Sequence, residues 1–237
     1  MAITPPPDWL ELQRTGKTVS IPFSRTKVLF GPVNEGLPHY FPDHARARID
    51  AANLKYVFSL NHDHHNNGDD TEGQNQVQSG GEQENNVLPE NYSFADLRDS
   101  DLQLALDRTH IPRTLNTLRR LVSVGLFYNA KSSSDSNSGP RSPVGWGFLG
   151  KDASIPSLHI KPEHRGEGLV VCLSKELINR QEKESAFAVS GKKGGRWAHA
   201  DVSWNNVNSR RVMEKLGGKS MWTVAWTEVD LSVLCGS

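Results

Sequence analysis

Cysteine, unbalanced charge and long apolar runs are all scarce in this chain of 237 residues. Its two cysteines, Cys172 and Cys235, are too few for a disulfide framework, which favours a reducing, cytoplasmic compartment. Basic and acidic side chains number 27 each, so no overall field attracts nucleic acid or an anionic membrane. The mean hydropathy is −0.55, and no run approaches the roughly 20 apolar residues of a membrane helix. The first residues also lack the basic and apolar parts of a secretory signal, and we expect a soluble cytoplasmic protein.

Residues 61–86 differ in composition from the rest of the chain. They hold six acidic side chains, no Lys or Arg, and Val77 as their one aliphatic side chain. Such a segment buries too little surface to offset the roughly 1–2 kcal/mol per residue that ordering a backbone costs. We therefore predict a disordered acidic insertion between an N-terminal lobe at 1–60 and a main domain at 87–237. Outside the insertion the chain carries 27 basic and 21 acidic side chains, which suits an anionic small ligand.

Short apolar runs alternate with segments of helical spacing along the chain. The apolar runs predict strands at residues 26–31, 56–60, 92–97, 123–128, 144–149, 157–160, 197–202 and 220–230. Helical spacing predicts helices near residues 43–54, over 100–122, after Gly168 and near 208–216, with Pro112 interrupting the second. Strands and helices mixed in this order predict an α/β or α+β domain around one sheet.

The most informative segment links a strand to a helix through a glycine-bearing turn. The strand at 157–160 is followed by a turn and then by Arg165-Gly-Glu-Gly168, where a helix begins. Glycine lets the backbone approach a ligand, and the unpaired N–H groups of a helix start attract phosphate. Gly-x-Gly is also common in plain tight turns. This segment alone therefore leaves a phosphate site and a structural turn as alternatives.

A second segment downstream completes a pattern. Asn206-Val-Asn-Ser209 opens a helix that closes in Leu216-Gly217, and Gly at a helix end is also a common C-cap. Taken together, the two segments resemble the GNAT acyltransferase superfamily. Its acyl-CoA motif has Arg-x-x-Gly-x-Gly/Ala at a helix start, and its later helix carries Asn-x-x-Ala/Ser and ends in Leu-Gly.

Further residues resemble the glycine N-acyltransferase-like branch of that superfamily. The branch has Leu-Val after its second glycine, as at Val170 here, and a tryptophan at the position of Trp146. Ala198-His199-Ala200-Asp201 is similar to its Ser-His-Val-Asp strand, and residues 27–38 resemble its N-terminal lobe in shortened form. The resemblance implies the GNAT fold: a mixed, mostly antiparallel sheet flanked by helices, with a small N-terminal lobe.

The resemblance also implies acetyl-CoA or another acyl-CoA as co-substrate, and no metal. The strand Leu158–Ile160 would lie along the pantetheine arm, and the N–H groups from Arg165 to Val170 would cradle the pyrophosphate. The N–H near Ile160 would polarise the thioester carbonyl. The residues that it places at acyl-CoA are Leu158, His159, Ile160, Arg165, Gly166, Glu167, Gly168, Leu169, Val170, Asn206 and Ser209.

The sequence departs from the superfamily where a base and an acid are usual. The frequent glutamate base falls on Ser154 and a common tyrosine acid falls on Met213, and neither side chain can do that chemistry. Asp152 lies two residues before Ser154 and would share its strand face. The candidate catalytic residues are Asp152, His159, His199, Asp201 and Ser209. Each has a structural alternative: a solvated turn, core packing, a structural hydrogen bond between the two strand residues, or a plain helix surface.

The implied reaction transfers an acetyl or short acyl group to a small amine or amino acid by direct attack. A non-catalytic acyl-CoA-binding protein stays open, because Ser154 and Met213 remove the usual base and acid. An acetyltransferase acting on protein amines also stays open, with the acidic insertion attracting basic substrates. The tract of His62, His64 and His65 resembles a metal site by composition only. The expected partners are acyl-CoA and the amine, and a homodimer is compatible with the sequence.

Overall fold

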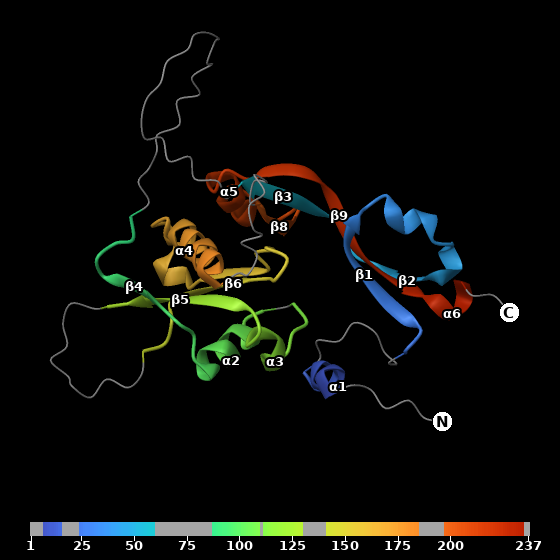
Figure 1. Cartoon of the computed structure of the whole chain (residues 1–237), viewed down its shortest axis with the longest axis horizontal. Coiled ribbons are helices and arrows are strands. Elements are labelled where there is room, and N and C mark those ends of the chain that lie inside the picture. Colours follow the sequence, from blue (N-terminus) through green and yellow to red (C-terminus); the bar gives the residue numbers. More distant parts are fainter. Residues whose placement is uncertain are drawn as a thin grey trace, which may run out of the picture.

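The strands that the structure describes form two sheets (Figure 1). The computed structural model describes residues 7–15, 24–59, 87–109, 111–129, 141–184 and 197–234. The first sheet has the order β4 (Tyr92–Ala95), β5 (Val122–Tyr128), β6 (Gly145–Leu149), β7 (Ser157–Ile160). The second has the order β1 (Lys27–Asn34), β9 (Lys219–Asp230), β3 (Asn53–Ser59), β8 (Trp197–Ser203), with β2 (Arg46–Ile49) also on β9. All these strand pairs are antiparallel, which confirms the α+β class and divides the expected single sheet in two.

Helices cover both faces of the first sheet (Figure 1). The α-helices are α1 (Pro7–Arg14), α2 (Asp99–Asp107), α3 (Leu115–Leu118), α4 (Leu169–Glu184), α5 (Val207–Lys215) and α6 (Leu231–Leu234). The short 3₁₀ turns are η1 (Leu37–Tyr40), η2 (Asp43–Ala45) and η3 (Pro162–His164). On one face, α4 packs through Leu173 and Leu177, which are fully buried. On the other face, α2 and α3 enclose Trp146 and Phe148 of β6.

One strand of the N-terminal segment lies inside the second sheet. β3 runs between β8 and β9 and pairs with both of them. Its Leu54, Tyr56 and Phe58 are buried in the main core, and the Tyr56 hydroxyl donates to Glu214 Oε1 on α5 at 3.0 Å. The segments on either side of residues 61–86 therefore share one sheet and one core.

The helix predicted near residues 43–54 is wrong. The chain forms the short turn η2 and then β2, whose residues alternate between half-buried and exposed. Arg and Ala are good helix formers. However, Arg46–Ile49 pairs with β9 and follows the two-residue period of a strand. Pairing with a distant strand therefore overrides the local helix preference.

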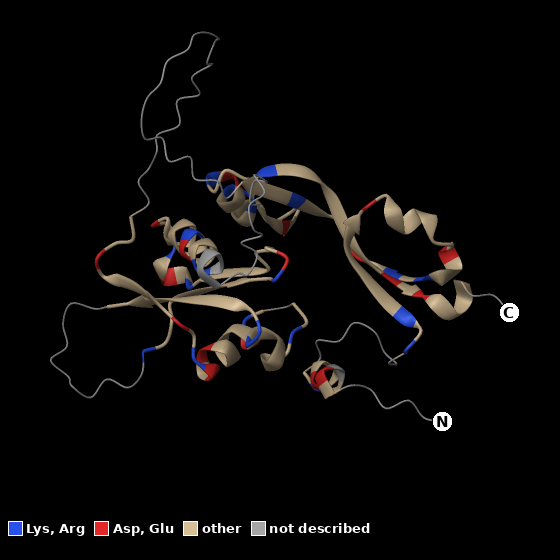
Figure 2. Ribbon diagram, viewed as in Figure 1, with Lys and Arg blue, Asp and Glu red and all other residues tan. Residues whose placement is uncertain are grey.

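Charges of both signs lie on the strands of the second sheet and on helices α4 and α5, whereas the four strands of the first sheet carry no Lys, Arg, Asp or Glu (Figure 2). Among the helices that the structure describes, none is long and apolar enough to cross a membrane. The predicted acidic insertion at 61–86 lies outside the described residues. Charge alone therefore does not single out a binding surface, and shape and local chemistry have to locate one.

We expect residues 87–237 not to fold cooperatively on their own. Without β3, the strands β8 and β9 lose their common partner, and the core loses three buried side chains. The fragment should show a broad thermal transition by circular dichroism and bind a hydrophobic dye. A fragment of residues 50–237 keeps β3 and serves as the control, with a sharper transition. A sharp transition of fragment 87–237 near that of the whole chain would contradict this expectation.

Candidate functional site

A cleft opens where the two sheets separate. Ser154 and His199 form a parallel bridge, beside which the N–H of Ile155 donates to the His199 carbonyl at 2.7 Å. The N–H of His199 donates to the Ala153 carbonyl at 3.1 Å. Beyond this bridge the described strands β7 and β8 are unpaired with each other, and a cleft of about 500 Å³ opens. It is lined by Leu158, His159, Ile160, His164, Arg165, Gly166, Gly168, Leu169, Val170, Asn206, Asn208, Ser209, Val212 and Met213.

The backbone of β7 is available to a ligand on its cleft side. β7 pairs with β6 and is the last strand of the first sheet. The N–H of Lys161 donates to the Val144 carbonyl at 2.8 Å, toward β6. Since the backbone groups of an antiparallel strand alternate in direction, those of Leu158 and Ile160 face the cleft. Arg165 Nε donates to the Ile160 carbonyl at 2.9 Å, which leaves the Ile160 N–H directed at the cleft.

The turn after β7 brings a helix start to the same cleft. Gly166 and Gly168 have φ angles of +92° and +72°, which favour glycine. No heavy atom lies within 4 Å of the place that a Cβ on Gly166 would take, so this backbone is open to a ligand. α4 begins at Leu169, and the N–H groups of a first helical turn have no acceptor in the helix. Such a start, on a helix of 16 residues, attracts phosphate or carboxylate.

The start of α5 forms the opposite wall. Asn206 is its N-cap, and the Oδ1 atom of Asn206 accepts from the N–H of Ser209 at 3.1 Å. Asn206 and Ser209 line the cleft, as does Met213, whose side chain is buried in the core. This wall therefore offers the polar groups of Asn206 and Ser209. At position 213 it offers a thioether, which has no acidic proton to donate.

The structure brings the residues predicted to contact acyl-CoA together around this cleft, with the exception of Glu167. Glu167 is exposed and contacts Tyr92, whose pKa is raised by burial and then by the Glu167 carboxylate. The binding role of the others stays a prediction. Sequence reasoning missed His164, Asn208 and Val212, which also line the cleft. Each of them lies within one helical turn of a residue that the sequence analysis did predict, and this spacing is the sequence signal that could have identified it.

His159 is one of the residues that line the cleft, and its ring packs against the first sheet. It stacks on Trp146, its cross-strand neighbour on β6, with ring centroids 4.3 Å apart and planes 16° apart. Its Nε2 atom is buried and has no hydrogen-bond partner among the described residues. Burial lowers the pKa of His159, and the charges of Arg165, Arg108 and Lys161 lower it further. The imidazole is therefore neutral at pH 7.

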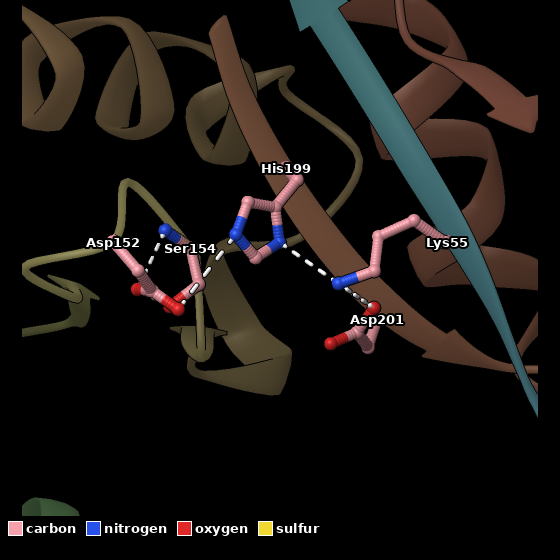
Figure 3. A network of polar contacts seen from close by, with 5 residues as sticks. All are labelled: Lys55, Asp152, Ser154, His199 and Asp201. Atoms are coloured by element: carbon pink, nitrogen blue, oxygen red, sulfur yellow. Dashed lines mark hydrogen bonds and ion pairs between the residues drawn. The ribbon is translucent and has the colours of Figure 1, made fainter. Parts of the chain in front are cut away.

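Three other candidate catalytic residues lie in a separate row of polar side chains (Figure 3). Asp201 Oδ1 pairs with Lys55 Nζ at 2.7 Å, and Lys55 Nζ contacts His199 Nδ1 at 3.2 Å. The Nε2 atom of His199 faces Asp152 Oδ2 at 3.7 Å. The other carboxylate oxygen, Asp152 Oδ1, accepts from the Ser154 hydroxyl at 2.6 Å and from the Ser154 N–H at 3.1 Å. The row therefore spans both sheets at the point where they separate.

The structure separates the expected pair of His199 and Asp201. Both side chains lie on the face of β8 opposite to the buried Ala198 and Ala200, but Lys55 of β3 stands between them (Figure 3). Sequence reasoning missed Lys55. The available signal was a lysine directly before the apolar run of residues 56–60.

Asp152 is the exposed end of the row, with 63% of its side chain accessible. Burial raises the pKa of Asp152, but the hydrogen bonds from Ser154, with a smaller contribution from the nearby His199, lower it by more. The net effect is a pKa below the usual range for this carboxyl. Asp152 is therefore a carboxylate at neutral pH, held at the level of the bridge by Ser154.

The remaining predicted positions contribute little to this site. Cys172 is buried on α4, in the core as expected. Within the described ranges, no three His, Cys, Asp or Glu side chains lie close enough to hold a metal ion. The tract of His62, His64 and His65 lies outside those ranges.

Comparison with known proteins gives a likeness of fold. No family model matches the chain, and no curated protein matches it. A Drosophila protein is similar over 96% of this chain and 68% of its own, with 15% identity and a TM-score of 0.56. A tandem GNAT protein from the clavulanic acid biosynthesis pathway is similar over 93% of this chain and 67% of its own, with 14% identity and a TM-score of 0.48. A GCN5-related N-acetyltransferase from Sphaerobacter thermophilus is similar over 86% and 60%, with 11% identity and a TM-score of 0.47.

Replacing His159 by Phe should flatten the dependence of stability on pH. The pKa of His159 is lowered in the folded chain, so below about pH 6.5 the unfolded chain binds more protons than the folded chain. The stability from the neutral ring is complete above that pH and is lost as the pH falls toward the folded pKa. The Phe ring keeps the stack on Trp146 and takes no proton. Between about pH 7.5 and 5.5, the Tm of the wild type should fall more than that of His159→Phe, and equal slopes would contradict this account.

Proposed function

We propose that this chain is an acyl-CoA-dependent N-acyltransferase of the GNAT type, which transfers an acetyl or short acyl group to a small amine or amino acid. The observation that carries the proposal is the cleft, in which the free edge of β7 leads into the glycine turn and the start of α4. A strand edge binds an extended amide chain through backbone hydrogen bonds, and a helix start binds phosphate. Coenzyme A offers these two parts in the same order, as a pantetheine arm and a pyrophosphate.

The residues present fit this co-substrate. The N–H groups of residues 166–170 would hold the pyrophosphate, and the backbone of Leu158 and Ile160 would pair with the pantetheine amides. The Ile160 N–H would then face the thioester carbonyl, where a fixed donor stabilises the negative charge that develops on oxygen. A cleft of about 500 Å³ is in the size range of small-molecule sites.

Acyl transfer needs a base for the amine. The N–H bond of the ammonium breaks, and the proton leaves. The freed electron pair on nitrogen forms the bond to the thioester carbon, and the C–S bond breaks with its pair on sulfur. The attacking nitrogen loses its second proton to the departing thiolate, so that a neutral amide and free CoA thiol form. Ser154 cannot take that proton at neutral pH, whereas the carboxylate that it holds, Asp152, can accept one. We therefore assign Asp152 as the base, and the thiolate leaves without an acid from position 213.

The buried Met213 also favours a second candidate, a protein that binds acyl-CoA without turning it over. One assay separates the two. The chain is incubated with acetyl-CoA and a panel of amines and amino acids, and release of free thiol is followed. Amine-dependent release supports the enzyme. Tight binding of CoA by calorimetry without thiol release for any acceptor would support the binding protein.

Gly168→Arg should weaken CoA binding at least about tenfold, which corresponds to about 1.4 kcal/mol. The side chain would enter the phosphate cradle, and the φ of +72° would strain a residue with a Cβ. Calorimetry with CoA measures the loss. Gly217→Arg is the matched control, because Gly217 has a φ of +82° and open space around it but does not line the cleft. If both variants fold and both keep wild-type CoA affinity, the cradle is assigned to the wrong residues.

Asp152→Asn should lower kcat by about 100-fold at pH 7 and leave the KM for acyl-CoA nearly unchanged, since a positioned base is worth 10²–10⁴-fold. A higher pH should restore part of the rate, because more of the amine is then neutral before it binds. Steady-state kinetics against pH measures both effects. A normal kcat would mean that the amine loses its proton in solution and that the enzyme supplies only position and the oxyanion contact.

A further inference from the structure

The side chain of Lys55 reaches from β3 into the row that contains the candidate base. Its ammonium lies 2.7 Å from Asp201 and 3.2 Å from His199 Nδ1 (Figure 3). The side chains of Lys55 and Asp201 are only 9% and 11% exposed. A buried ammonium must be paired, and Asp201 supplies that pair. The ion pair therefore fixes the ammonium at one place beside the imidazole.

An ammonium group has three donors and no acceptor. Toward a charged Lys55, Nδ1 of His199 can only accept, so the ring proton must sit on Nε2. Nε2–H then points at Asp152 Oδ2, 3.7 Å away. In this tautomer the one lone pair of the imidazole is occupied by Lys55. His199 has no free nitrogen with which to take a proton from an amine.

The lack of a free nitrogen on His199 is important because His199 lies beside the candidate base. His199 is the bridge partner of Ser154, so its side chain lies at the same level of the sheets as the carboxylate of Asp152. Either group would otherwise be a suitable proton acceptor at this level. The Oδ1 atom of Asp152 is bound by Ser154, and Oδ2 is the oxygen that Ser154 leaves free for a proton.

We propose that Lys55 is a positioning residue for the acyl transfer: it holds His199 as the Nε2–H tautomer, excludes this imidazole as the base, and so directs the proton of the amine to Asp152. The proposal rests on the proposed function. The ammonium N–H bond breaks, its proton passes to Asp152 Oδ2, and the freed electron pair on nitrogen forms the bond to the acyl carbon. The C–S bond breaks with its pair on sulfur, and the second nitrogen proton passes to the departing thiolate. His199 neither gains nor loses a proton in this step.

The tautomer is tested directly by NMR on the full chain labelled with ¹⁵N-histidine, with His199→Gln to assign the signals. The wild type should show His199 protonated on Nε2 only. In Lys55→Met/Asp201→Leu both charges are removed together, so that no unpaired charge is left buried. In this variant, the His199 ring should become a mixture of the Nδ1–H and Nε2–H tautomers. The single variant Lys55→Arg, which keeps a donor beside Nδ1, should give the wild-type spectrum. A wild-type ring protonated on Nδ1, or a double variant with an unchanged spectrum, would overturn the proposal.

Kinetics test the consequence for catalysis. Asp152→Asn should lower kcat about 100-fold in the wild-type background, but less than about tenfold in the Lys55→Met/Asp201→Leu background, where the released imidazole can replace the lost carboxylate. Equal losses in the two backgrounds would overturn the role of Lys55 in directing the proton. If no amine is acylated at all, the proposed function fails and this catalytic role fails with it. The spectra still decide separately whether Lys55 sets the tautomer.

Discussion

The backbone hydrogen bonds of His199 with Ala153 and Ile155 are the constraint on which the site depends. They hold the first sheet against the second at one level only, and beyond that level the described strands β7 and β8 have no backbone pairing with each other. Each strand then has an edge whose polar groups need partners. The separation creates the cleft and leaves backbone donors along its β7 wall.

The two-residue period of β8 places its alternate side chains on opposite faces of the second sheet. On β8, alternate residues point into the core or away from it, so Ala198 and Ala200 pack while His199 and Asp201 stay on the opposite face. The cleft and the polar row are therefore two surfaces that share one junction. A reaction between a ligand in the cleft and a partner at the polar row has a structural basis in this arrangement.

The ion pair of Lys55 and Asp201 contributes little net stability to the folded chain. Desolvating two charges often cancels their attraction, and apolar side chains of similar size are frequently as stable. Its value lies in geometry, because the pair fixes a cation next to His199. This cation comes from β3, so the N-terminal segment supplies both a strand of the core and part of the polar chemistry.

The sequence alone determined the local features of this protein. Apolar runs predicted most strands, and Arg165-Gly-Glu-Gly168 predicted the turn and helix start, because glycine at positive φ and unpaired N–H groups are properties of neighbouring residues. Tertiary structure decided the rest. The strand Arg46–Ile49, the division into two sheets and the place of Lys55 between Asp201 and His199 all depend on pairing between distant segments. A residue pattern records the period of a strand, but the partner of that strand is fixed only when the whole chain packs.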